Sequence, residues 1–174
     1  EQALFTGSAD AREAAGRELL RAEARLAQER GRTLHADFLS ERKEDPRELE
    51  LFSRSLELAR EAGDERLESW AEFWIGIVHQ VVRDENERSL PYFQAAYDWA
   101  RDNGETLLQS YAIRHLGFGW YEQGSRGEGR SALEESVRLR REDGFLPGVA
   151  AGLLTLAEIA DEEGRSDDAR RLLE

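Results

Sequence analysis

The chain has 174 residues, 40% of them apolar and 35% charged, with a formal net charge of −13 at pH 7 and no cysteine. This composition excludes a disordered chain and a fold held by disulfides or thiolate-bound metals, and no stretch approaches the roughly 18 apolar residues that a membrane-spanning helix needs. The acidic charge also argues against a nucleic-acid partner, since nucleic-acid affinity comes largely from Lys and Arg, and it favours a basic or neutral partner.

The first predicted element is a long amphipathic helix near residues 9–30, which could run on toward Glu41. Residues 11–30 are rich in Ala, Glu, Arg and Leu and do not share the repeat that follows. Residues 1–10 lack the basic start and apolar core of a signal peptide, so we expect a cytoplasmic protein. We interpret residues 1–31 as an N-terminal segment and helix that caps the rest of the domain.

A repeat of about 40 residues follows this helix. Gly63, Gly104 and Gly144 each end a helix-like run and follow one another at intervals of 41 and 40 residues. Glycine readily adopts the left-handed conformation that ends helices, and a new run of apolar residues spaced three and four apart begins after each of the three. We predict helices near residues 46–62, 64–83, 89–103, 105–123, 128–143, 146–163 and 166–174. They form the repeats 32–63, 64–104, 105–144 and 145–174, the last one incomplete, within a single domain of residues 1–174.

The two strongest repeats carry a recognisable motif. In one, Leu116, Gly117 and Trp120 are followed by Gly124 and Gly129; in the other, Leu156, Ala157 and Ala160 are followed by Gly164 and Ala169. The pattern resembles the tetratricopeptide-repeat (TPR) family, in the longer-repeat variety of bacterial regulators and kinesin light chains. The resemblance implies an all-α fold, a right-handed superhelical solenoid of antiparallel helix pairs. It also implies a scaffold role, because the concave inner face of such solenoids commonly holds peptides.

The predicted helix 64–83 is apolar nearly all round, so two of its faces must be covered. Ala71, Ile75 and Val78 share a register with core residues of the next repeat and account for one face. By family register, a second line and its counterparts one repeat later point into the concave groove: Trp70, Phe73 and Ile77, then Tyr111, Arg114, Phe118 and Tyr121. We predict that this set binds the partner. The alternative is that the N-terminal helix folds over these residues, or that the longer helices need a wider core.

No residues converge as a catalytic, cofactor or metal site. Residues 124–131 have the glycine spacing of a nucleotide-binding loop, but Arg130 stands where Lys is required, and the preceding residues are helical by period. His35, His79 and His115 form no local metal-binding pair, and we expect His79 to be packed and hydrogen-bonded. We therefore expect no enzyme activity, no cofactor and no bound metal.

Two functions remain open. The first is a protein–protein interaction module that takes up a peptide or helix in a concave aromatic groove, with acidic rims that favour a basic partner. The second is a regulatory or self-association domain of a larger bacterial regulator, which would act as a homo-oligomer. The absence of methionine and the short last helix, with Leu172 and Leu173 still apolar, favour this second function.

Overall fold

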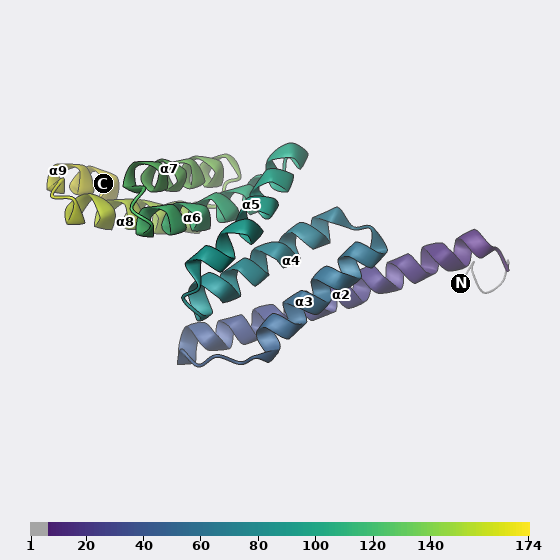
Figure 1. The fold of residues 1–174 in the computed structure, drawn as a ribbon. Coiled ribbons are helices and arrows are strands. Elements are labelled where there is room, and N and C mark those ends of the chain that lie inside the picture. Colours follow the sequence, from purple (N-terminus) through teal and green to yellow (C-terminus); the bar gives the residue numbers. More distant parts are fainter. Residues whose placement is uncertain (1–6) are drawn as a thin grey trace. The chain divides into compact units, whose positions relative to one another are not determined.

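The computed structural model describes residues 7–174, and these residues form helices joined by short turns (Figure 1). The helices are α2 (Ala9–Glu41), α3 (Arg47–Ala62), α4 (Glu65–Ile77), the π-helical turn η1 (Val78–Val82), α5 (Asn86–Asn103), α6 (Thr106–Glu122), α7 (Arg126–Glu142), α8 (Leu146–Glu162) and α9 (Ser166–Leu173). Residues 7–174 contain no strand, which confirms the all-α prediction. Within this range, no helix is both long and apolar enough to cross a membrane.

The chain divides into two compact units, Glu1–Ser89 and Leu90–Glu174. In the first unit α2 packs on α3 and α3 packs on α4, with a smaller contact between α2 and α4. In the second unit α6 packs on α7, α7 on α8, and α8 on α9. In these five pairs, helices adjacent in sequence are packed neighbours. The single domain and the superhelical solenoid stay predictions.

The N-terminal helix α2 is one continuous helix of 33 residues. The side chain of Ser8 caps its start by accepting a hydrogen bond from the backbone N–H of Ala11 at 3.3 Å. The helix runs through residue 32, where we placed the first repeat boundary, and ends at Glu41, which confirms the longer of the two predicted extents. Close packing holds it on α3, because a Cβ atom at Gly31 would lie only 2.6 Å from Cε1 of Phe52.

The turns confirm the glycine positions on which the repeat was based. Gly63, Gly104 and Gly144 have φ angles of 63°, 71° and 75°, in the left-handed region that favours glycine. The start of α5 was predicted three residues too late, at Ser89. This serine lies inside the helix, where its hydroxyl donates to the carbonyl oxygen of Asn86 at 2.7 Å instead of capping a helix start.

The predicted helix 64–83 changes its hydrogen-bonding pattern at Val78, where α4 gives way to the π-helical turn η1. The chain then turns sharply at Asp84, which has a φ angle of 57°. The backbone N–H of Glu85 donates to the carbonyl oxygen of His79 at 2.7 Å, and Nδ1 of His79 lies 2.7 Å from Oε2 of Glu85. His79 is buried and hydrogen-bonded, as predicted.

Two glycines allow α6 and α7 to approach each other closely. A Cβ atom at Gly117 would lie 2.9 Å from the carbonyl oxygen of Gly129, and one at Gly129 would lie 2.7 Å from the carbonyl oxygen of Gly117. Any side chain here would force the helices apart, so both positions require glycine. This contact places the first turns of α7 beside Tyr121, near the C-terminal end of α6.

Candidate functional site

The predicted partner-binding residues of α4 are unequally accessible. Phe73 and Ile77 are buried, with exposed fractions of 3% and 4%, whereas Trp70 is half-buried. The ring of Trp70 meets the ring of Phe73 edge to face, with centroids 5.9 Å apart. Of the three, only Trp70 therefore presents surface that a partner could touch.

Trp74, whose place the sequence leaves open, lies under the N-terminal helix. Its ring stacks on Phe52 of α3, with centroids 5.4 Å apart, and meets the ring of His35 of α2 at 5.6 Å. The guanidinium of Arg32, also on α2, lies 5.6 Å from the Trp74 ring. For this tryptophan the structure agrees with the alternative in which the N-terminal helix covers the aromatic side chains.

The predicted residues of α6 share one face of the helix, and we call this set the α6 face: Tyr111, Arg114, Phe118 and Tyr121. All four are half-buried. Phe118 and Tyr121 pack against a cluster of buried residues from α7 and α8. The α6 face thus combines a packed apolar edge with accessible aromatic surface. The α4 and α6 residues belong to different compact units.

Arg114 lies at the centre of the α6 face. Its guanidinium carbon is 4.7 Å from the centre of the Phe118 ring, close enough for a cation–π contact. Its Nη2 donates a hydrogen bond of 3.2 Å to the hydroxyl oxygen of Thr155 on α8. Burial and the nearby charge of Arg140 lower the pKa of Arg114 to about 10, so the side chain still carries its charge at neutral pH.

Arg140 of α7 is an arginine in a core position. It follows Leu133 and Val137 at helical spacing, and only 3% of it is exposed. Its Nη1 donates to the carbonyl oxygen of Gly148 at 2.9 Å, and its guanidinium carbon lies 5.1 Å from the ring of Tyr111. Nε of Arg140 is buried and has no hydrogen-bond partner within the described chain.

The first turn of α8 is shaped to admit Arg140. A Cβ atom at Gly148 would lie 2.9 Å from Cδ of Arg140 and 2.4 Å from the ring of Phe145, so a larger residue would close this space. We did not predict Arg140 as part of the site. Two features of the sequence could have indicated it, namely an arginine on the apolar stripe of α7 and a glycine near the start of the next helix.

We call Arg114 and Arg140 the arginine pair. Across residues 7–174, neither guanidinium forms an ion pair with a carboxylate; the carboxylate of Glu158 acts on Arg114 only from a longer distance. Burial also lowers the pKa of Arg140. Two neighbouring cations, one half-buried and one almost fully buried, thus have no carboxylate in direct contact, an arrangement that costs free energy.

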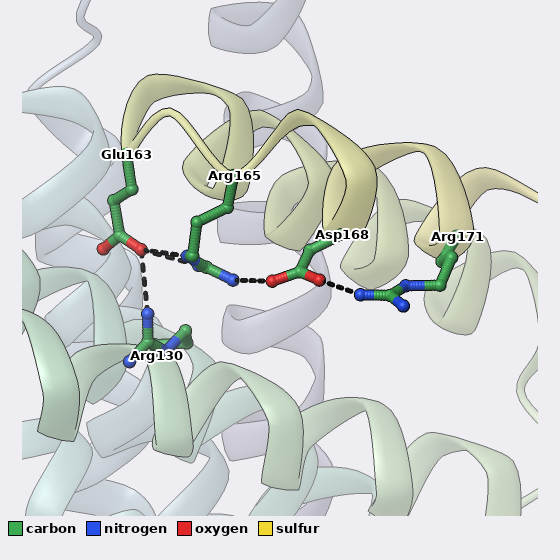
Figure 2. Close-up of polar contacts among 5 residues, drawn as sticks. All are labelled: Arg130, Glu163, Arg165, Asp168 and Arg171. Carbon is green, nitrogen blue, oxygen red and sulfur yellow. Dashed lines mark hydrogen bonds and ion pairs between the residues drawn. The ribbon is translucent and has the colours of Figure 1, made fainter.

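A second group of arginines, around the turn between α8 and α9, is paired with carboxylates (Figure 2). Oε2 of Glu163 accepts from Nη1 of Arg130 at 2.8 Å and from Nη2 of Arg165 at 2.6 Å. Arg165 also reaches Oδ2 of Asp168 at 2.8 Å, and Arg171 pairs with the other oxygen of that carboxylate. We call these five residues the charge chain.

Positive and negative groups alternate along the charge chain, so every member touches a group of opposite charge. Hydrogen bonds from Arg165 lower the pKa of Glu163 and of Asp168, with further contributions from Arg130 and Arg171. A surface depression of about 380 Å³ lies at the same turn, lined by Gly164, Arg165, Ser166, Asp167, Asp168 and Arg171. Each of its charged groups already has a partner of opposite charge: Asp168 pairs with Arg165 and Arg171, and Asp167 pairs with Arg170.

The histidines contact neighbouring side chains of the fold. Nδ1 of His35 lies 2.9 Å from Oε1 of the buried Glu48, and the ring of His115 stacks on Phe93 with centroids 5.0 Å apart. Within residues 7–174, no group of three or more His, Asp or Glu side chains is placed to hold a metal ion.

The comparisons with known proteins assign no family. No family model matches the chain, and no curated protein matches it. The TPR resemblance therefore stays a prediction from the residues that carry it.

Proposed function

We propose that this protein is a protein–protein interaction module of the TPR-like kind, which holds a peptide or helix of a partner protein in an aromatic groove. The single observation that carries the proposal is the α6 face, where three half-buried aromatic side chains share one side of the helix with an arginine. Aromatic and arginine side chains dominate the binding energy of protein interfaces. In this proposal the protein acts as a cytoplasmic scaffold, not as an enzyme, and needs no cofactor.

The charge of the protein suggests what surrounds the bound segment. A net charge of −13 attracts basic residues, and long-range attraction mainly raises the rate of association. We therefore propose that the partner segment carries basic residues, whereas its apolar side chains contact the α6 face.

A second candidate function is self-association. Leu19 and Leu26 of α2 are 65% and 51% exposed and lie seven residues apart, two turns along one side of the helix. Another copy of the chain could cover these leucines. The mass in solution, measured by light scattering during size-exclusion chromatography, separates the two candidates: a monomer supports the interaction module, and a concentration-independent dimer supports self-association.

The interaction module is tested by selecting binders from a random peptide library and comparing two matched tyrosine variants. Tyr121 and Tyr97 are both half-buried, and each has an arginine near its ring, Arg126 at 5.6 Å and Arg101 at 5.9 Å. We expect Tyr121→Ala to lose the selected peptides and Tyr97→Ala to keep them. Equal losses in both variants, or no enrichment of any peptide by the wild-type protein, would contradict the proposal.

A further inference from the structure

The N-terminal helix α2 carries a second apolar stripe besides the one that packs on α3 and α4. Ala24 belongs to the packed stripe and lies in a buried cluster with Leu58 of α3 and Leu67 of α4. Side chains two residues apart on a helix point in nearly opposite directions, so Ala22 faces away from this cluster. Four exposed residues share that outer side, and we call them the leucine stripe: Ala15, Leu19, Ala22 and Leu26. Figure 1 shows that the N-terminal part of α2 runs past the end of α3.

The spacing of the leucine stripe is typical of a helix that pairs with another helix. Its members are four, three and four residues apart, which keeps them in line along one side of α2. Leucine and alanine alternate in this line. Against a second copy that runs in the opposite direction, Leu19 lies opposite Ala22, and Leu26 lies opposite Ala15. Every large side chain then meets a small one, which allows the two helices to pack closely.

The charges beside the leucine stripe favour the antiparallel arrangement. Glu18 and Arg25 lie on the same flank of the stripe, each directly before a leucine. In an antiparallel pair this flank faces the same flank of the second copy, so Glu18 of each copy meets Arg25 of the other. In a parallel pair it faces the opposite flank, which carries Glu23 and Arg30. Glu18 would then meet Glu23, and Arg25 would meet Arg30, so a parallel pair brings like charges together.

We propose that two copies of the chain associate through the leucine stripes of their α2 helices in antiparallel orientation. This inference rests on the second candidate function, self-association, and names the surface and the orientation that it uses. The association is symmetric, because each copy presents the same stripe and the same flank to the other.

The charge of α2 fits a second copy as the occupant of the stripe. The net charge of −13 makes two copies repel each other, but arginines and acidic residues nearly balance along residues 9–33. Two copies therefore approach through α2 with little repulsion. Within residues 7–174, Arg25 forms no ion pair, so its charge is available to the second copy. Glu18 pairs with Arg21 of its own helix, but 67% of its side chain stays exposed.

The leucine stripe is tested by sedimentation equilibrium with two matched leucine variants. Leu26 and Leu39 both lie on α2 and are 51% and 49% exposed, but Leu39 is not part of the stripe. Leu26→Glu should raise the dissociation constant of the dimer about 10-fold or more, because it brings a charge into an apolar contact. Leu39→Glu should leave the constant unchanged. Equal effects of the two variants, or a wild-type protein that stays monomeric, would overturn the proposal.

The orientation is tested by exchanging the charges of Glu18 and Arg25, which are both exposed. In the antiparallel dimer, Glu18→Arg and Arg25→Glu should each raise the dissociation constant about 5-fold, because each creates like-charge contacts. The double variant should restore the value of the wild-type protein. In a parallel dimer each single variant would instead strengthen association, through Glu23 or Arg30, and that result would overturn the proposal.

A distance between spin labels gives the orientation independently. The chain has no cysteine, so Thr33→Cys, at an exposed position of α2, takes a single label per copy. In the antiparallel dimer Thr33 lies beside Ser8 of the second copy, and at 1.5 Å per residue the two labels are about 38 Å apart. Labels about 10 Å apart, the spacing of parallel neighbouring helices, would contradict the proposed orientation.

One more variant separates this inference from the proposed functions. Tyr121→Ala should remain dimeric, because Tyr121 belongs to the α6 face and not to the leucine stripe. A dimer that Tyr121→Ala breaks, or that Leu26→Glu leaves intact, would overturn the inference and leave self-association standing. A wild-type protein that is monomeric at every concentration would contradict both and leave the interaction module standing.

Discussion

The arginine pair and the charge chain lie in the same compact unit and use the same cation in opposite ways. In the charge chain, Arg130 and Arg165 meet Glu163 in ion pairs that are partly exposed to solvent. In the arginine pair, Arg114 is half-buried and Arg140 is almost fully buried, and the two meet aromatic rings, a hydroxyl and a backbone carbonyl instead of a carboxylate. A close ion pair therefore does not by itself identify a charge that matters for function. Exposed pairs add little to stability, whereas buried charges without a counterion must be offset by other interactions or by a ligand.

The largest expected effect concerns the packing of Arg140. Because its stem fills a core position beside Gly148, Arg140→Ala should lower the free energy of unfolding by about 2–4 kcal/mol, as truncation of a large buried side chain does. Urea denaturation measures this. Arg138→Ala should unfold close to wild type, because Arg138 is exposed.

A companion variant separates the volume of Arg140 from its charge. Arg140→Met keeps most of the volume and removes the buried cation, so it should recover most of the stability that Arg140→Ala loses. If Arg140→Met is as unstable as Arg140→Ala, the charge itself holds the fold, and the contrast between the two regions is wrong.

A smaller effect is expected in the charge chain, and its pH dependence has a definite sign. The pKa values of Glu163 and Asp168 are lowered in the folded protein by hydrogen bonds from Arg165. Stability from these carboxylates is therefore present above their unfolded pKa values, about 4.3 for Glu and 3.9 for Asp, and is lost as the pH falls through the lower folded values.

Arg165→Gln should accordingly lower the midpoint of thermal unfolding only slightly, by the same amount at pH 7 and pH 5. The difference from wild type should begin to shrink near pH 4 and disappear once the pH is below the lowered folded pKa values of the two carboxylates. The same difference should shrink in molar salt, which screens exposed charges. A large loss that persists in acid and in salt would show that the turn between α8 and α9 depends on this arginine for packing.

Much of the fold follows from local sequence signals, because helix periodicity and the ends of helices are local properties. The turns predicted at Gly63, Gly104 and Gly144 are confirmed, because all three glycines have left-handed φ angles. The same periodicity placed Tyr111 and Arg114 on one face of α6, where the structure has them. Sequence spacing alone was sufficient for these features because each depends on residues within a few turns of one helix.

The remainder depends on contacts between helices, which spacing within one helix does not reveal. Phe73 shares a helix and a periodicity with Trp70, yet only Trp70 keeps exposed surface. The burial of Arg140 depends on the missing side chain at Gly148 of the next helix. In each case a neighbouring element decides how much of the side chain water or a partner can reach.

The central claim is that the charge of Arg114 serves a ligand and not the fold. The variant with the smallest expected change in stability tests this claim most directly. The measurement is the free energy of unfolding of Arg114→Gln against wild type, by urea denaturation of the unliganded proteins at neutral pH. Removing a partly buried cation beside Arg140 should leave the protein as stable as wild type or more stable, as is common for residues retained for function. A loss of more than about 1.5 kcal/mol, the value of a hydrogen bond to a charged group, would show that Arg114 holds α6 to α8 through Thr155 and would contradict the claim.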